Sequence, residues 1–245
     1  MSKKKVMIFR VDVSNKMGTG HLERCKIIAE KLTKYFEIIF LTKTKDILFW
    51  KFRNIKLLIY SESEINFFYK KKLGDPKYIF FFDLNLVYVN KKERFFINQI
   101  KKLNKSIYFH HDLKNINLKN LIIVPYVIHF DKKLLNKNIL IGPKYCLFKK
   151  QIVQLTKKRP KTKKIITICF GGSDPMNLTK KTLVELIQNF KNKNYKIIAI
   201  VGKLYLKERL NELIYLSKKN KSIKVYKNPK NIYPLISSSK ISIVN

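Results

Sequence analysis

The alternation of apolar and amphipathic segments near the amino terminus restricts the fold more than any other feature of the sequence. Residues 6–11 and 37–41 are short apolar runs, and residues 22–34 between them carry apolar side chains at helical spacing. A strand, a helix and a second apolar strand predict a β-α-β unit, which implies a parallel sheet with a right-handed crossover. The amino-terminal part of the chain is therefore predicted to be an α/β fold.

The same alternation continues along the chain. Further strands are predicted at residues 56–60, 78–82, 106–109, 121–124, 165–170, 195–201, 223–226 and 241–244. Further helices are predicted at residues 47–52, 61–72, 91–103, 177–190, 207–216 and 232–237. Ser61 or Ser63 is expected to cap the second of these helices. The third helix is expected to bury an apolar stripe made of Phe95, Phe96, Ile100 and Leu103.

A change in composition divides the chain. The apolar content falls after Lys149, and residues 157–164 are nearly all charged. We predict a first lobe over residues 1–150, a basic linker over residues 151–164 and a second lobe over residues 165–245. A nuclear or nucleic-acid-binding signal is the alternative interpretation of the charged run.

The composition limits the function classes. With 46% hydrophobic residues the chain has enough apolar material for a core, and its formal net charge is +37. Such a charge favours nucleic acid or an acidic membrane surface. The lysines are distributed over every segment, however, so we interpret them as solvated surface residues and predict no specific nucleic-acid partner. The positive field would still favour an anionic substrate such as a nucleotide sugar.

The cysteines and the longest apolar runs indicate the cellular setting. Cys25, Cys146 and Cys169 are an odd number, lie far apart and include no Cys-x-x-Cys pair, so neither a disulfide framework nor a zinc knuckle is indicated. Free thiols suit a reducing cytoplasm. The apolar runs at residues 78–89 and 121–130 are too short to cross a bilayer. We therefore predict a soluble, cytoplasmic protein without a membrane span.

The turn between the first strand and the first helix carries side chains suited to chemistry. Gly18 and Gly20 allow positive φ and a close approach of the backbone to a ligand. His21 follows at the predicted start of the helix, where an imidazole can act as a base near neutral pH. Arg24 lies on the same helical face and can meet a carboxylate or a phosphate. A hydrogen-bonding cap is the alternative role for His21.

Polar residues also follow two of the later predicted strands. Asp83 lies at the carboxyl end of a strand, where open α/β sheets bind ligands, and a turn-capping aspartate is the alternative. His110, His111 and Asp112 suggest a metal site. Adjacent side chains on an extended chain point to opposite faces, however, so we predict no metal there.

Two glycines follow the first strand of the second lobe. Gly171 and Gly172 let backbone N–H groups face outward, and the helix after them presents the positive end of its dipole. Both features favour a phosphate group. The structural alternative is that Asp174 is the N-cap of this helix and Pro175 its first residue.

These turns lie in longer patterns. From Phe9 the sequence follows Phe-Arg-x-Asp-x-Ser and then Gly-x-Gly-His-x-x-Arg, and from Gly171 it follows Gly-Gly-Ser-Asp-Pro-x-Asn-Leu-Thr. Both patterns resemble the nucleotide-sugar hydrolases of pseudaminic acid biosynthesis, which remove UDP from 2,4-diacetamido-2,4,6-trideoxy-β-L-altropyranose. The segment from Gly142 to Tyr145 is similar to the Gly-x-x-Tyr segment that closes the first lobe in that family.

The resemblance implies an α/β fold of two Rossmann-like lobes with parallel sheets, of the glycosyltransferase B type. In the family the last strand leads into a Gly/Ser-rich turn and a helix that hold the nucleotide, and the sequence reaches Asn245 before these elements. The second lobe is therefore expected to be incomplete and the enzyme truncated at its carboxyl terminus.

The resemblance also implies the roles of individual residues. His21 corresponds to the base that activates water. As our own hypothesis, Asp12 or Asp83 orients the imidazole or the sugar. Asn85 stands where the family usually has the tyrosine of an Asp-x-Tyr strand end. The residues expected to bind the substrate are Arg10, Gly18, Gly20, Arg24, Asn85, Gly171, Gly172, Ser173, Asp174 and Asn177. The expected partner is a UDP-sugar, and no cofactor or metal is expected.

The expected function is hydrolysis of a UDP-linked 2,4-diacetamido-2,4,6-trideoxy sugar, which releases UDP and the free sugar for pseudaminic acid biosynthesis. Three alternatives stay open at this point. The first is a related glycosyltransferase of surface polysaccharide synthesis. The second is an inactive remnant of a hydrolase, and the third is a non-enzymatic nucleic-acid binder that acts through its positive charge.

Overall fold

The computed structural model describes residues 4–109, 120–125, 138–147, 162–189 and 194–244. The chain divides into two compact units. The first unit comprises Met1–Val13 with His21–Leu147, and the second unit comprises Ser14–Gly20 with Phe148–Asn245. Within the described ranges, no helix combines the length and the apolar content needed to cross a membrane.

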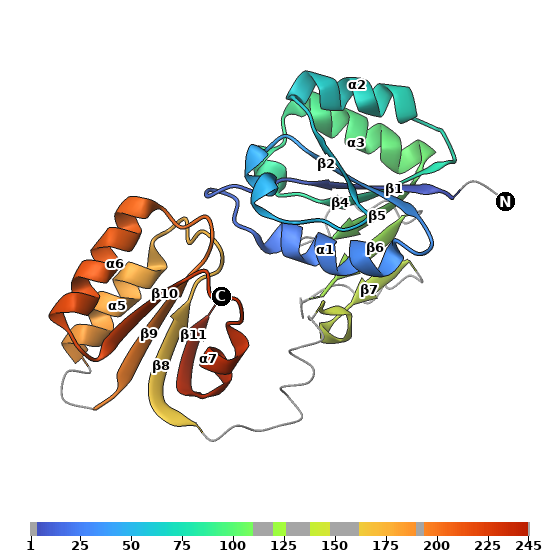
Figure 1. Cartoon of the computed structure of the whole chain (residues 1–245). Helices are drawn as coiled ribbons and strands as arrows, with labels where there is room; N and C mark the ends of the chain where they lie inside the picture. The colour runs from blue at the N-terminus through green and yellow to red at the C-terminus, as the bar shows by residue number, and fades with distance from the viewer. Residues whose placement is uncertain (1–3, 110–119, 126–137, 148–161, 190–193, 245) are drawn as a thin grey trace. The chain divides into compact units, whose positions relative to one another are not determined.

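The first unit is built on a parallel sheet of seven strands (Figure 1). The order across the sheet is β3-β2-β1-β4-β5-β6-β7, so the strand order reverses at β1. The strands are β1 Val6–Val11, β2 Glu37–Thr42, β3 Lys56–Ile59, β4 Tyr78–Asp83, β5 Lys105–Phe109, β6 Leu121–Val124 and β7 Ile139–Ile141. The first six were expected from the sequence, whereas β7 was not predicted as a strand.

Helices cover both faces of this sheet. In Figure 1, α2 (Glu62–Lys72) and α3 (Lys91–Leu103) lie side by side on one face, and α1 (Gly20–Leu32) lies on the other. Among the described residues of this unit, short 3-10 helices also connect the elements: η1 Lys45–Phe49, η2 Leu86–Tyr88 and η4 Pro143–Tyr145. Because both faces are covered, the central strand β1 is buried at every position.

Neighbouring strands align their apolar side chains in register. Ile8 of β1 lies beside Ile39 of β2 and Phe80 of β4, and all three belong to the core cluster that also contains side chains of α2 and α3. On the other face, Phe9 stacks on Phe81 with ring centroids 4.7 Å apart. The parallel register therefore fixes how the carboxyl ends of these strands are aligned.

One local prediction for the first unit needs correction, and one stated alternative is decided. The segment at residues 47–52 is not an α-helix, because its helical part is the 3-10 helix Lys45–Phe49. The cap of α2 is Ser61 rather than Ser63. The Ser61 hydroxyl accepts from the N–H of Glu64, and the Glu64 carboxylate accepts from the N–H of Ser61, which forms a capping box.

The apolar stripe predicted for α3 is partly wrong. Phe95 and Leu103 are each 57% exposed, whereas Glu93, Ile97 and Ile100 are buried. Residues four and seven positions after Glu93 share its face at 3.6 residues per turn, so the buried face of α3 begins with an acidic side chain. The sequence pattern predicted a different buried face, because a glutamate is normally assigned to the solvent-exposed side of a helix.

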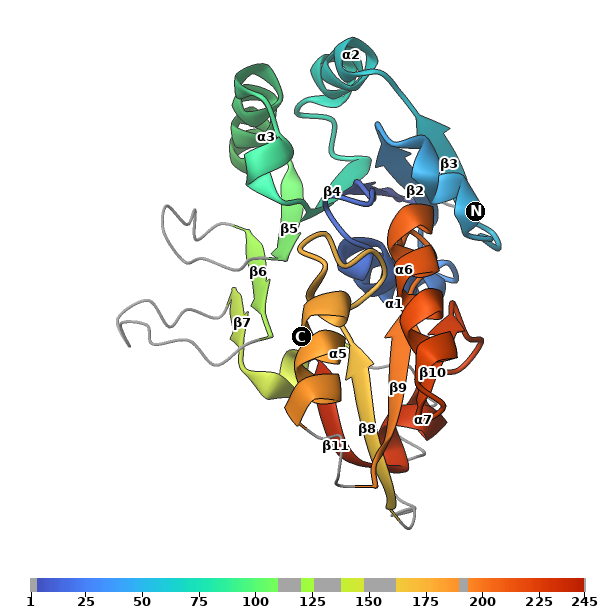
Figure 2. The same cartoon turned by 90° about the vertical axis from the view of Figure 1, so that its left-hand side faces the viewer.

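The second unit contains a smaller parallel sheet in the order β10-β9-β8-β11. The strands are β8 Lys163–Cys169, β9 Lys196–Val201, β10 Ile223–Lys227 and β11 Ser239–Val244, and the helices are α5 Leu178–Asn189, α6 Lys207–Lys219 and α7 Tyr233–Ser237. In both views α5 and α6 lie side by side against one face of this sheet (Figures 1 and 2). Its core includes Ile166, Ile168, Leu183 and Leu213.

Parts of the sequence interpretation concern residues that are not described. His110, His111 and Asp112 lie outside the described residues, as does most of the predicted linker over residues 151–164. The last two linker residues, Lys163 and Lys164, begin β8 with exposed side chains.

Candidate active site

The candidate site of the first unit lies at the carboxyl edge of its sheet, where the strand order reverses. β2 and β3 lie on one side of β1, and β4 lies on the other. Chain segments that leave two such strands diverge, and open α/β sheets bind their ligands in the resulting crevice. Asp83 is the last residue of β4, and His21 is the second residue of α1, the helix that follows β1.

His21, Asp83 and Arg24 form a hydrogen-bonded cluster at this edge. Nδ1 of His21 lies 2.5 Å from Oδ1 of Asp83. Arg24 donates to both oxygens of the same carboxylate, from Nε to Oδ2 and from Nη2 to Oδ1, each at 2.9 Å. Asp83 has no exposed side-chain surface, whereas the side chains of His21 and Arg24 are 13% and 20% exposed. The cluster is thus a buried carboxylate with two partially accessible nitrogen donors.

The electrostatics fix the ionisation of this carboxylate. Burial acts to raise the pKa of Asp83, but the hydrogen bonds from His21 and Arg24 outweigh burial and hold the pKa below its ordinary value. Asp83 is therefore ionised at neutral pH, and we assign the proton between it and His21 to Nδ1. In that tautomer Nε2 of His21 carries the lone pair, so the imidazole can accept a proton at Nε2.

Arg10 and Asp12 form a second cluster inside the first unit. Nη1 and Nη2 of Arg10 donate to the two oxygens of Asp12 at 2.6 Å and 2.8 Å, and Nε donates to Oε1 of Glu93 at 2.8 Å. Arg10 and Glu93 have no exposed side-chain surface, and Asp12 has 3%. Burial acts to raise the pKa of Asp12, but the interactions with Arg10 and Lys43 together outweigh it and the pKa is lowered. The structure therefore pairs Asp12 with Arg10, and pairs His21 with Asp83.

Asp12 also joins the ends of two strands. Its Oδ1 accepts hydrogen bonds from the hydroxyl of Thr42 at 3.0 Å and from the backbone N–H of Lys43 at 2.9 Å. The N–H of Val13 donates to the hydroxyl of Thr44 at 3.1 Å. These contacts fix the carboxyl ends of β1 and β2 beside the loop that leads to His21. Sequence reasoning missed Glu93 and Thr42, and the only signal for Glu93 was its spacing with Ile97 and Ile100.

The remaining predicted residues of the first strand-to-helix turn and of the β4 end have local roles. Gly18 has a φ of +83°, and its N–H donates to the carbonyl of Ser14 at 2.9 Å, whereas Gly20 is the first residue of α1. Asn85 is exposed, and its side-chain oxygen accepts from the N–H of Val87 at 3.1 Å. Gly18 therefore needs its conformational freedom, and Asn85 supports its own turn.

The glycine-containing turn of the second unit is organised by Asp174. Gly171 has a φ of +80°, and the Asp174 carboxylate accepts the N–H groups of Leu178 at 2.8 Å and Thr179 at 2.7 Å. Helix α5 begins at Leu178, so Pro175 is not its first residue, contrary to the structural alternative stated above. The Asp174 carboxylate occupies two of the donors at this helix end that were expected to attract a phosphate.

Other side chains hold this turn from α6 and the loop before it. The hydroxyl of Tyr205 donates to Oδ1 of Asn177 at 3.0 Å, and burial raises the pKa of Tyr205 to about 12. Arg209 donates to the carbonyls of Asp174 at 3.0 Å and Pro175 at 3.2 Å. Ser173 is buried, and Gly172 approaches Gly202 so closely that a Cβ on Gly202 would lie 2.3 Å from the Gly172 Cα.

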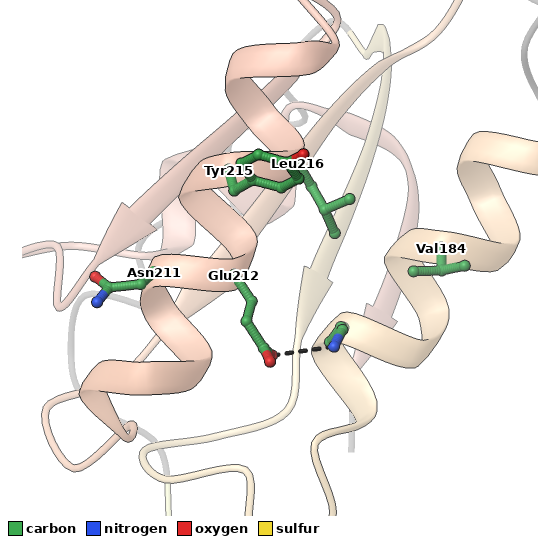
Figure 3. Close-up of a pocket in the computed structure, with 6 residues that line it drawn as sticks. Val184, Asn211, Glu212, Tyr215 and Leu216 are labelled. Carbon is green, nitrogen blue, oxygen red and sulfur yellow. Dashed lines mark ion pairs between the residues drawn. The ribbon is translucent and has the colours of Figure 1, made fainter.

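A separate hollow of about 450 Å³ lies on the second unit between α5 and α6 (Figure 3). An ion pair joins Lys180 and Glu212 across it at 3.1 Å. None of the six residues that line it is a predicted site residue. In the described part of the chain, no group of three or more His, Cys, Asp or Glu side chains is arranged to hold a metal ion.

Comparisons with known proteins define the fold class. No family model matches the sequence. The chain is 30% identical over 253 residues to a protein of Methanocaldococcus jannaschii described as uncharacterized protein MJ1062, and the match covers 96% of this chain. The match covers 50% of the length of this curated relative.

A solved structure shows the same architecture. A glycosyltransferase from Rickettsia africae ESF-5 superposes with a TM-score of 0.53 at 14% sequence identity, over 98% of this chain and 72% of that chain. WaaG, a glycosyltransferase involved in lipopolysaccharide biosynthesis, gives a TM-score of 0.47 at 8% identity, over 96% and 74%. The protein is an α/β protein of the glycosyltransferase B type, with two parallel sheets that correspond to two Rossmann-like lobes.

Proposed function

We propose that the protein is a nucleotide-sugar hydrolase that cleaves a UDP-linked 2,4-diacetamido-2,4,6-trideoxy sugar into UDP and the free sugar. The proposal is carried by the contact between Nδ1 of His21 and Oδ1 of Asp83 at the edge where the strand order reverses. It is supported by the resemblance of the Gly-x-Gly-His-x-x-Arg turn to the hydrolases of pseudaminic acid biosynthesis.

In the proposed reaction, Nε2 of His21 takes a proton from a water molecule. The water oxygen forms a bond to the anomeric carbon of the sugar, and the bond between that carbon and the diphosphate oxygen breaks, so UDP leaves with the bonding electrons. Asp83 keeps the imidazole oriented and stabilises the imidazolium that forms. Asp12 contributes indirectly, because it fixes the strand ends that carry the loop to His21.

The assay for this proposal follows UDP release and the fate of the water oxygen. In water enriched in oxygen-18, attack at the anomeric carbon places the label in the free sugar, whereas attack at phosphorus places it in UDP. We expect His21→Ala to lower kcat by about 10²–10⁴-fold, the contribution typical of a general base. Glu30→Ala, on the exposed side of the same helix, is the matched control and should retain full turnover. Normal turnover in His21→Ala would contradict the assignment of the base.

A glycosyltransferase is the second candidate, and the superposition with the Rickettsia africae glycosyltransferase favours it. In that case His21 deprotonates a sugar or lipid hydroxyl in place of water. The two functions differ in their need for an acceptor. A hydrolase releases UDP in buffer alone and labels the sugar, whereas a transferase releases UDP at a substantial rate only after an acceptor is added, and its product carries no label from water.

A further inference from the structure

The guanidinium of Arg24 holds both oxygens of the Asp83 carboxylate, through Nε and Nη2. Its Cζ also lies 4.9 Å from the ring centroid of Phe109, at the end of the neighbouring strand β5. A planar fork that binds two oxygens and stacks on an aromatic ring has a defined orientation, which a lysine at the same position could not reproduce. Arg24 therefore connects α1 to the ends of β4 and β5.

We infer that Arg24 is a positioning residue, which fixes Asp83 so that its Oδ1 accepts from Nδ1 of His21 and Nε2 stays the basic nitrogen. This inference rests on the proposed function, in which His21 is the base. It replaces the substrate-binding role that the sequence suggested for Arg24.

The contacts at Oδ1 of Asp83 support this assignment. Oδ1 accepts from Nδ1 of His21 at 2.5 Å and from Nη2 of Arg24 at 2.9 Å, and the two nitrogens lie 3.1 Å apart. Two unprotonated acceptors would repel each other at 2.5 Å, so a proton lies between His21 and Asp83. Arg24 cannot accept a hydrogen bond, and by donating to Oδ1 and Oδ2 it leaves the remaining lone pair of Oδ1 for the imidazole.

The charges give a reason for an arginine at this position. Asp83 has no exposed side-chain surface, and a buried carboxylate needs a compensating partner. Cys25 also faces Asp83, but burial raises the pKa of its thiol well above the ordinary value, so Cys25 adds no charge at neutral pH. The permanent charge of Arg24 compensates Asp83 whether His21 is neutral or protonated. His21 can then gain and lose a proton in each turnover without leaving Asp83 unpaired.

The first experiment compares the kinetics of Arg24→Met and Arg24→Lys with the wild-type protein. We expect Arg24→Met to lower kcat by about 100-fold, the cost of a misplaced catalytic group, with KM unchanged. Arg24→Lys restores the charge without the planar fork and should recover part of the loss. Arg53→Met, at an exposed arginine of the same unit, is the matched control. An increase in KM with kcat unchanged would show that Arg24 binds the substrate, and would overturn the inference.

The second experiment measures the tautomer of the His21 imidazole by nitrogen-15 NMR and does not depend on turnover. The sequence contains four histidines, so the nitrogen-15 signals of His21 can be assigned by their loss in His21→Gln. The wild type should show the tautomer protonated on Nδ1, and Arg24→Met should lose this preference while circular dichroism shows an intact fold. If Arg24→Met does not fold, Arg24→Lys serves in its place, with a smaller change expected. Unchanged His21 signals in the folded variant would overturn the inference. Failure of the wild type to hydrolyse UDP-sugars would instead contradict only the proposed function.

Discussion

Nδ1 of His21 lies 2.5 Å from Oδ1 of Asp83, although 62 positions separate the two residues in the sequence. The first residue belongs to the helix after β1, and the second ends β4, so the contact joins the two segments at which the strand order reverses. A histidine that contacts a buried carboxylate is an arrangement that can support general-base catalysis.

Asp83→Asn tests this arrangement. An amide at this position can present its NH₂ group to Nδ1, which favours the tautomer with the proton on Nε2 and removes the base. We expect kcat to fall by up to about 10⁴-fold, as when the aspartate of a catalytic triad is replaced by asparagine. Glu62→Gln, which changes an exposed carboxylate of α2 in the same way, should not alter kcat. Full activity in Asp83→Asn would mean that Asp83 has only a structural role.

Arg10→Met should destabilise the first unit. The substitution removes the guanidinium that pairs with the buried carboxylates of Asp12 and Glu93, and breaking a buried ion pair costs about 3–5 kcal/mol. Urea unfolding can be followed by the fluorescence of Trp50, the only tryptophan in the sequence, whose Nε1 donates to Glu23 at 2.9 Å. Arg53→Met, at an exposed position, should leave the midpoint unchanged. A loss below about 1 kcal/mol in Arg10→Met, as for surface pairs, would contradict this role.

The stability of the first unit should decrease in acid. The pKa values of Asp12 and Asp83 are lowered in the folded protein, so the unfolded chain binds protons to these groups at a higher pH. Their stabilisation is complete above the unfolded value of about 3.9 and is lost as the pH falls through the folded values. The unfolding free energy, measured through Trp50, should therefore fall below about pH 4, with a shallower slope in Asp83→Asn. A constant free energy between pH 5 and pH 3 would contradict the prediction.

Gly202→Ala should disturb the turn of the second unit. A Cβ at this position would lie 2.3 Å from the Cα of Gly172, and the neighbouring atoms are backbone, which cannot rotate away. We expect a loss of about 1–3 kcal/mol, as for overpacked sites, together with amide chemical-shift changes at Gly171 and Ser173. Gly74→Ala is the comparison variant. Gly74 has open space around it but a φ of +75°, so this variant tests backbone strain without a steric clash. Unshifted amides in Gly202→Ala would show that the turn does not depend on this close approach.

Much of the fold was accessible from the sequence because its signals are local. The apolar run at residues 6–11, the capping residue Ser61 and the apolar run that ends at Asp83 each depend on neighbours within a few positions. The stripe of α3 was one exception. Its buried face contains Glu93, whose partner Arg10 lies 83 positions earlier. A local sequence pattern cannot predict an ion pair between residues so far apart.

In the candidate site, too, the sequence predicted local features but not the contacts between residues that are distant in the sequence. The sequence by itself determined that a histidine begins the helix after the first strand, that an aspartate ends the strand at residues 78–82, and that arginine follows the histidine by one helical turn. Only the tertiary structure decided that Asp83, and not Asp12, contacts His21, and that Arg24 donates to that carboxylate. The physical reason is that strand order and parallel register place β4 directly beside β1, and they arise from packing over the whole sheet.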